Sequence, residues 1–336
     1  MGRFPAITTG LLLSLLVAIP GCLPSRIAID LAPGDGRLDE TEVMETPGPD
    51  HAAKIALVDV TGMISHLAAP GLVAGGHNPV DALAAALAKA ESDPKVRAVI
   101  LRINSPGGTV AATDTAYNEV RRFRERTSKP VIASEADVAA SGGYYLALAC
   151  DRIIAEPSTI TGSIGVLMQT FNFSQGMAKL GIDGRAVISR PNKNLASPFE
   201  PAQPEHYAIL QGLVDQMYAE FTNIVRERRP SINASDFDEL TDGRVFTGRQ
   251  ALDVGLVDEI GGVHEAFAAA QRLASLHGAR LVKYHAEGAP VRSAYASATL
   301  PSPQANPWPN PLGLALEQVT RGHPPVAYYL WSPGLN

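Results

Sequence analysis

Cysteine is almost absent from this chain of 336 residues, which has only Cys22 and Cys150. Two cysteines exclude the dense disulfide framework of small secreted domains. Cys150 lies in an apolar run, where we expect a small core residue rather than a reactive thiol. No group of cysteine and histidine has the spacing of a metal site, so the sequence predicts no metal and no cofactor.

Positive charge is also scarce. The chain has 28 Lys and Arg against 34 Asp and Glu, a formal net charge of -6. Proteins that bind nucleic acid normally carry a basic patch or stripe, so nucleic acid is not an expected partner. Hydrophobic residues make up 46% of the chain, and its length allows one large domain or two ordinary ones.

The N-terminal residues have the pattern of an export signal. Arg3 precedes an apolar stretch that ends in small residues before Cys22. This ending resembles a bacterial lipoprotein box, which predicts a signal peptide over 1–21 and a lipid on Cys22. An uncleaved anchor and a plain secretory signal remain alternatives. In each case we expect the domain to lie outside the cytoplasm, in the cell envelope. Residues 22–53, which are acidic and rich in Pro and Gly, predict a flexible tether.

Strands alternate with helices from Lys54 onward. Residues 96–103 form a β-branched run typical of a strand that is buried on both faces. A glycine turn and an amphipathic helix follow this run, and the same unit recurs at 130–150. Residues 204–228 predict a long amphipathic helix that turns Leu210, Leu213 and Phe221 inward. This alternation predicts an α/β fold with a mainly parallel sheet.

Ser141 stands directly before two glycines, at the expected start of a helix. Glycines let the backbone turn sharply and approach a ligand closely. A helix N-terminus also favours the negative charge that an attacking serine creates. A helix-capping serine is the alternative. Neither glycine turn has the spacing of a P-loop or a dinucleotide fingerprint.

Four blocks, in this order, resemble the signal peptide peptidase A family of serine–lysine peptidases: INSPGG (103–108), VAASGGYY (138–145), TGSIGV (161–166) and DGRVFTGRQALDVGLVDEIGG (242–262). The resemblance runs from about Lys54 to about Ala274. It implies the Clp-protease/crotonase fold of repeated β-β-α units, with a peptidase domain over 54–286 and Ser141 as the nucleophile. The Pro-rich tail over 287–336 lies outside the resemblance and has no assigned role.

A serine nucleophile needs a base, and no histidine lies between His77 and His206. The resemblance places the family's lysine on Lys193, with Ser163 orienting its amine. A lysine accepts a proton only as the neutral amine, which burial favours. The resemblance also implies that the backbone N–H groups of Gly142 and Gly107 hold the oxyanion, with Gly108 as the alternative to Gly107.

Taken together, the sequence predicts a membrane-tethered serine endopeptidase that cleaves residual signal peptides or other exported apolar peptides. We expect a small or medium apolar residue before the scissile bond. Short members of the family resemble rings, so we expect a homo-oligomer in which Ser141 of one protomer pairs with Lys193 of the next. A crotonase-like acyl-CoA enzyme is an alternative that the export signal disfavours. A catalytically silent scaffold lipoprotein is another, which the presence of both Ser141 and Lys193 disfavours.

Overall fold

The computed structural model describes residues 38–67, 78–286, 291–296 and 327–331. The predicted signal peptide, the predicted lipidation site Cys22 and the first part of the predicted tether lie outside these residues.

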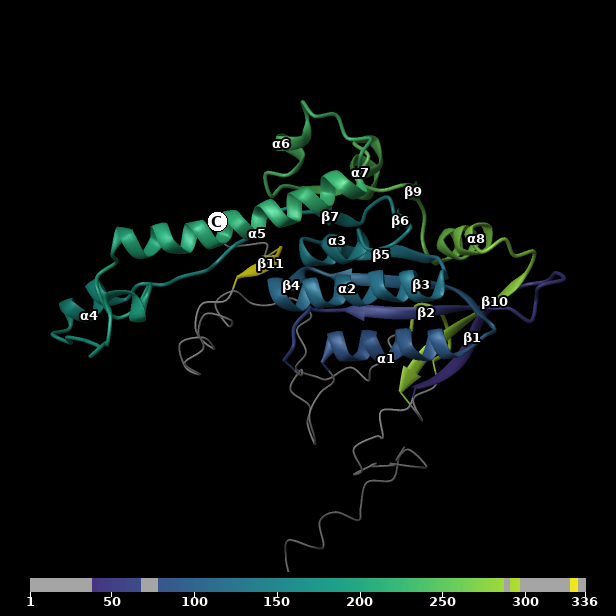
Figure 1. The fold of residues 1–336 in the computed structure, drawn as a ribbon, viewed down its shortest axis with the longest axis horizontal. Coiled ribbons are helices and arrows are strands. Elements are labelled where there is room, and N and C mark those ends of the chain that lie inside the picture. The colour runs from purple at the N-terminus through teal and green to yellow at the C-terminus, as the bar shows by residue number, and fades with distance from the viewer. Residues whose placement is uncertain (1–37, 68–77, 287–290, 297–326, 332–336) are drawn as a thin grey trace, which may run out of the picture. The chain divides into compact units, whose positions relative to one another are not determined.

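A mainly parallel sheet organises the domain (Figure 1). Its strands follow the order β1-β10-β2-β3-β5-β6-β9, and from β10 to β9 all neighbours are parallel. The bounds of the parallel strands are β2 Lys54–Thr61, β3 Val96–Ser105, β5 Val131–Ala140, β6 Arg152–Ala155, β9 Glu259–Ile260 and β10 Ala279–Ala286. The α/β class predicted from the alternation of strands and helices is therefore confirmed.

Helices cover both faces of this sheet. Val99 and Leu101 of β3 belong to the hydrophobic core that contains the buried residues of α1 Pro79–Ser92, α2 Val110–Thr127 and α3 Gly142–Ala147. Ala98 and Ile100 belong to a second core with α8 Val263–Leu273. Successive residues of a strand point to opposite faces, so β3 is buried on both, as its β-branched run predicts.

The remaining elements are shorter or lie at the margins of the sheet. They are β4 Gly107–Thr109, β7 Ile160–Gly162, α4 Ser174–Lys179, the 3-10 helix η1 Pro191–Asn194, α5 Pro204–Arg228, α6 Phe237–Leu240, β8 Val245–Thr247, α7 Gly248–Asp253 and β11 Tyr328–Leu330.

Helix α5 has the predicted bounds but not a uniform inner face. Phe221 and Val225, near its C-terminal end, are fully buried, whereas Leu213 is 43% exposed. Figure 1 shows α5 as a long helix whose N-terminal end leads to α4, away from the sheet. The expectation that Leu213 points inward is wrong in the single chain, because the helix extends past the core that it was expected to cover.

The predicted tether over 22–53 needs a correction as well. Leu38–Thr46 forms strand β1, which pairs antiparallel with β10. Acidic side chains of β1 form ion pairs, Glu40 with Lys54 and Glu42 with Arg280. Acidic composition by itself favours a solvated tether. In this fold it belongs to an edge strand whose carboxylates meet basic partners.

Candidate active site

Ser141 lies at a strained turn between β5 and α3 and is 1% exposed. Its φ of 53° and ψ of −112° lie outside the regions that non-glycine residues normally occupy. The Ser141 N–H donates to the Gly162 carbonyl at 2.7 Å, and the Ser141 carbonyl accepts from the Tyr145 N–H at 2.8 Å. The side chain makes no capping hydrogen bond to α3, which argues against a purely capping role. Strain of this kind costs on the order of 1–3 kcal/mol and clusters at functional sites.

Ser163 lies next to Ser141 at the same edge of the sheet. Strand β7 runs parallel to β5, with Gly162 paired with Ala140, so both serines directly follow a paired residue. Ser163 also has a positive φ, 51°, and its N–H donates to the Arg244 carbonyl at 2.7 Å. The structure thus brings the predicted nucleophile and the serine predicted to orient the base together.

The two glycine turns meet beside Ser141. A Cβ on Gly142 would lie 3.1 Å from both Gly107 Cα and the Gly108 nitrogen. Gly107 has a φ of +108°, which L side chains rarely adopt, so this approach depends on glycine. The Gly107 N–H donates to Ser105 Oγ at 3.1 Å. Gly108 is in turn paired with Tyr329 of β11, so Gly107 and its sequence alternative Gly108 both remain candidates for the second oxyanion donor beside Gly142.

Lys193 is not near Ser141 in the single chain. It lies in η1 and is exposed, within a segment that we call the arm, residues 170–203. Hydrogen bonds join the arm to itself, such as Phe173 N–H to the Pro198 carbonyl at 2.7 Å and Asn194 Nδ2 to Glu200 Oε2 at 2.6 Å. Figure 1 shows the arm around α4, at the far end of α5 from the sheet that carries α3. The roles of Ser141, Lys193, Ser163, Gly107 and Gly142 remain predictions.

Two residues that the sequence did not single out lie at this corner. Thr113 Oγ1, in the first turn of α2, is buried without a hydrogen-bond partner among the described residues, and a Cβ on Gly142 would lie 2.7 Å from it. Tyr329 of β11 packs against Tyr145, with ring centroids 5.0 Å apart. The aromatic run around Tyr329, within a Pro-rich tail, was the only local signal for the second residue.

Glu135 is a fully buried carboxyl on the strand that leads to Ser141. Neither carboxyl oxygen has a hydrogen-bond partner among the described residues. Burial raises the pKa of Glu135 to about 8, since the charged form loses its hydration. The strand that leads to Ser141 is therefore buried, and its one buried acidic side chain, Glu135, is neutral at moderate pH.

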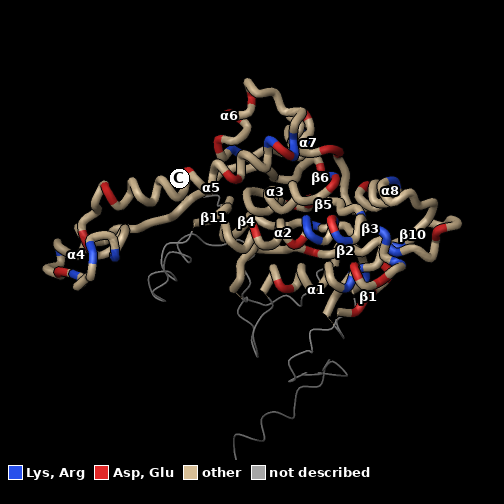
Figure 2. The backbone as a smooth tube through the Cα atoms, in the orientation of Figure 1, with Lys and Arg blue, Asp and Glu red and all other residues tan. Residues whose placement is uncertain are grey.

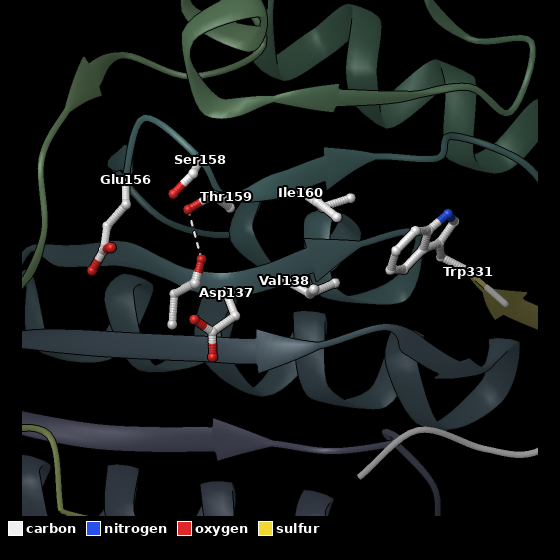
Figure 3. A pocket seen from close by; sticks show the side chains of 8 residues that line it. Asp137, Val138, Glu156, Ser158, Thr159, Ile160 and Trp331 are labelled. Atoms are coloured by element: carbon white, nitrogen blue, oxygen red, sulfur yellow. Dashed lines mark hydrogen bonds between the residues drawn. The ribbon is translucent and has the colours of Figure 1, made fainter. Parts of the chain in front are cut away.

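A cavity of about 490 Å³ opens beside β5 and β7 (Figure 3). Trp331 lies at one end near Val138 and Ile160, and Asp137 and Glu156 lie toward the other. Trp331 directly follows β11, so this end of the cavity lies next to the C-terminal segment 327–331.

Within the described residues, no three His, Cys, Asp or Glu side chains are grouped as a metal site would require. The helices in the same part of the chain are each too short or too polar to cross a bilayer.

Comparison with known proteins shows related chains across this region. The model of peptidase family S49 matches residues 124–277. A putative protease of Synechocystis is 37% identical over 223 residues, which cover 66% of this chain and 75% of that protein. The putative signal peptide peptidase SppA of Enterococcus faecium is 30% identical over 279 residues, covering 82% of this chain and 80% of that protein.

Longer proteins and one solved structure also match. Protease 4 of Haemophilus influenzae is 38% identical over 220 residues, which cover 66% of this chain but 35% of that protein, so this chain spans about a third of it. A membrane-bound stomatin-specific protease of known structure aligns with a TM-score of 0.40 at 17% identity, covering 63% of this chain and 82% of that one. From its family match and from relatives of similar length, the chain belongs to peptidase family S49, the SppA-type proteases.

Proposed function

We propose that the protein is a serine endopeptidase in which Ser141 is the nucleophile. The observation that carries this proposal is the strained turn at Ser141, which directly adjoins the corner where Gly107, Gly108 and Gly142 meet. Membership of a peptidase family favours this function over the acyl-CoA alternative.

The chemistry follows from the groups at this corner. Ser141 Oγ attacks the peptide carbonyl and passes its proton to the amine of Lys193. Backbone N–H groups of Gly142 and Gly108 or Gly107 stabilise the oxyanion. The protonated amine then gives its proton to the leaving amine. In the second half, the neutral amine takes a proton from water, whose oxygen attacks the acyl carbonyl. The bond to Ser141 Oγ then breaks, and the protonated amine returns its proton to Oγ, which restores both groups.

The base comes from a neighbouring copy of the chain in this proposal. Lys193 is exposed and lies on the arm, whereas Ser141 is buried at the sheet. A lysine acts as a base only as the neutral amine, a form that is favoured when apolar groups surround the amine. Docking of the arm against the Ser141 corner of a second copy would bury the amine and complete the dyad.

Apolar side chains on the arm support this assembly. Val187 is fully exposed and Leu180 is 77% exposed. Further exposed residues of the same kind are Phe173, Ile182, Ile188 and Phe199. Exposed apolar side chains that gather on one segment indicate an interaction site, and a second copy of the chain is the occupant that the proposal requires.

The substrates that we propose are residual signal peptides and other exported apolar peptides. The elements at the corner, β4, β11 and α3, contain no charged residue. Figure 2 shows Lys, Arg, Asp and Glu on other elements, such as β1 and α7. A relative named as a putative signal peptide peptidase points the same way. A lipid on Cys22 would hold the enzyme at the membrane of the cell envelope, where such peptides accumulate.

A covalent probe tests the nucleophile. A fluorophosphonate should label the assembled protein on Ser141, as identified by peptide mapping, and Ser141→Ala should abolish the label. Ser92→Ala, at the end of α1, serves as the matched control and should label normally. A label on another serine would contradict the assignment.

Mass spectrometry of the membrane fraction tests the tether separately. The proposed form begins at a lipid-modified Cys22. An unmodified Cys22, or an intact segment starting at Met1, would contradict it.

A further inference from the structure

Thr113 differs from the other two threonines of helix α2 in what its hydroxyl contacts. A threonine inside a helix commonly donates its hydroxyl to the carbonyl four residues earlier. Thr115 and Thr127 do so, to the carbonyls of Ala111 and Phe123, both at 2.8 Å. The side chain of Thr113 is fully buried, yet its Oγ1 has no hydrogen-bond partner among the described residues. Its own helix therefore does not use this hydroxyl.

The other buried threonines of the described part of the chain show what is normal in this fold. Their hydroxyls all donate to backbone carbonyls, and these residues are Thr159, Thr161, Thr222 and Thr241. A buried hydroxyl without a partner lowers stability, because it has given up its hydrogen bonds to water. An exception of this kind calls for a functional reason.

The hydroxyl of Thr113 faces the first residue of helix α3, Gly142. A Cβ on Gly142 would lie 2.7 Å from Thr113 Oγ1 and 3.1 Å from the Gly108 nitrogen. In a helix, the Cα–Cβ bonds and the N–H bonds both point toward the N-terminal end. Thr113 Oγ1 therefore lies on the side of Gly142 to which its N–H points, and the Gly108 nitrogen lies on that side as well.

The groups at this corner share one buried environment. Gly107, Gly108 and Gly142 are buried, as Thr113 is. A substrate carbonyl that reaches the N–H groups of these glycines must enter the same space. In such a low-dielectric place a hydrogen-bond donor stabilises negative charge more strongly than it does in water, and side-chain hydroxyls are among the donors that form oxyanion holes.

We propose that Thr113 is a further catalytic residue, whose hydroxyl donates a third hydrogen bond to the oxyanion, beside the N–H of Gly142 and that of Gly108 or Gly107. The acceptor for this bond forms when Ser141 Oγ attacks and negative charge develops on the substrate carbonyl oxygen. The bond is then stronger in the transition state than in the ground state, which is the condition for raising kcat. The inference rests on the proposed function, because it places Thr113 relative to the nucleophile.

Two substitutions in the full-length assembled protein isolate the hydroxyl. Thr113→Ser and Thr113→Ala differ from each other by one oxygen atom. Thr113→Ser should keep most of the kcat for an apolar peptide substrate. Thr113→Ala should lower kcat about 10–100-fold with little change in KM, as expected for the loss of one hydrogen bond to a charged group. Thr115→Ala removes a hydroxyl that is bonded to its own helix, so it is the matched control and should leave kcat unchanged.

Thermal unfolding separates this role from a structural one. The oxygen that Thr113→Ala lacks has no partner among the described residues, so the melting temperature of Thr113→Ala should be no lower than that of Thr113→Ser. A structural hydroxyl would instead make Thr113→Ala the less stable of the two. If Thr113→Ala does not fold, Thr113→Val fills the place of the hydroxyl with a methyl group and is held to the same criteria.

Two results would overturn the inference. One is equal kcat in Thr113→Ser and Thr113→Ala. The other is a loss of kcat in Thr113→Ala that comes with a lower melting temperature, since the hydroxyl would then support the fold. Failure of the proposed function looks different, because the wild type itself would then not be labelled by a fluorophosphonate on Ser141.

Discussion

Ser141 and Lys193 lie in parts of the molecule with opposite properties. Ser141 is 1% exposed, and two neighbouring strands, a glycine turn and α3 hold the backbone around it. Lys193 is exposed on the arm, among apolar side chains that the single chain leaves uncovered. Under the proposed function, one chain holds the nucleophile and the oxyanion donors, while the base needs the surface of a second chain. This division would keep an unassembled protease inactive.

Complementation between two inactive variants tests most directly whether the serine and the lysine of one site come from different chains. Ser141→Ala and Lys193→Ala should each lower turnover by a factor on the order of 10⁴–10⁶. Mixing the two variants after dissociation and reassembly should restore activity, because some sites then combine a native serine with a native lysine. Reassembly of each variant alone is the control. If mixtures remain inactive although subunit exchange is shown by mass, the dyad belongs to one chain.

Gly142→Ala tests how tightly the nucleophile half is built. The added Cβ would lie 2.7 Å from Thr113 Oγ1 and 3.1 Å from Gly107 Cα, so the turn must shift and move its N–H groups. We expect a loss of about 10²–10³ in kcat, the scale for losing one oxyanion donor. Gly212→Ala in α5 has no atom within 4 Å of its new Cβ and should leave kcat unchanged. Normal turnover by Gly142→Ala would show that the corner does not hold the oxyanion.

Glu135→Gln tests whether the carboxyl of Glu135, on the strand before Ser141, is shielded from water in the folded protein. The pKa of Glu135 is about 8 in the folded protein against 4.5 in the unfolded chain, so the folded state holds a proton that the unfolded state releases. The stability contribution is present below pH 4.5 and is lost as pH rises through 8. At about 1.4 kcal/mol per pKa unit, the loss amounts to several kcal/mol.

The glutamine variant should remove this pH dependence. Urea unfolding at pH 5 and pH 8.5 should show that the wild type loses stability and that Glu135→Gln loses much less. Glu125→Gln, on the exposed side of α2, should behave like the wild type. An equal change in the free energy of unfolding between the two pH values in all three proteins would mean that water reaches the Glu135 carboxyl.

The smallest effect on folding is expected on the arm. Leu180→Ser and Val187→Ser replace exposed side chains, so the free energy of unfolding of the single chain should change by less than about 0.5 kcal/mol per site. The mass measured by light scattering should nevertheless fall toward that of the single chain, and peptidase activity should fall with it. Unchanged mass and activity would show that the apolar residues of the arm are not the interface.

Local sequence patterns were sufficient to predict the helices and strands in which buried residues recur at regular intervals. The β-branched run became β3, buried on both faces, and the apolar run after Ser141 became the buried α3. The glycine turns were also readable, because Gly107 takes a backbone angle that other residues rarely adopt. The helix over 204–228 was predicted with its observed bounds, but the side on which Leu213 lies was not.

By itself, the sequence determined the α/β class, the order of the helices and strands, and Ser141 as the serine that the family resemblance singles out. Each of these depends on residues that are near one another in the chain. Tertiary structure decided the rest. Strand β1 forms where the chain pairs with β10, and in β11 the side chain of Tyr329 packs against Tyr145 and Phe221. The distance between the arm and Ser141 likewise depends on where α5 leaves the core. Contacts between residues so far apart in the chain leave no period or spacing in the local sequence, so only the folded chain could show them.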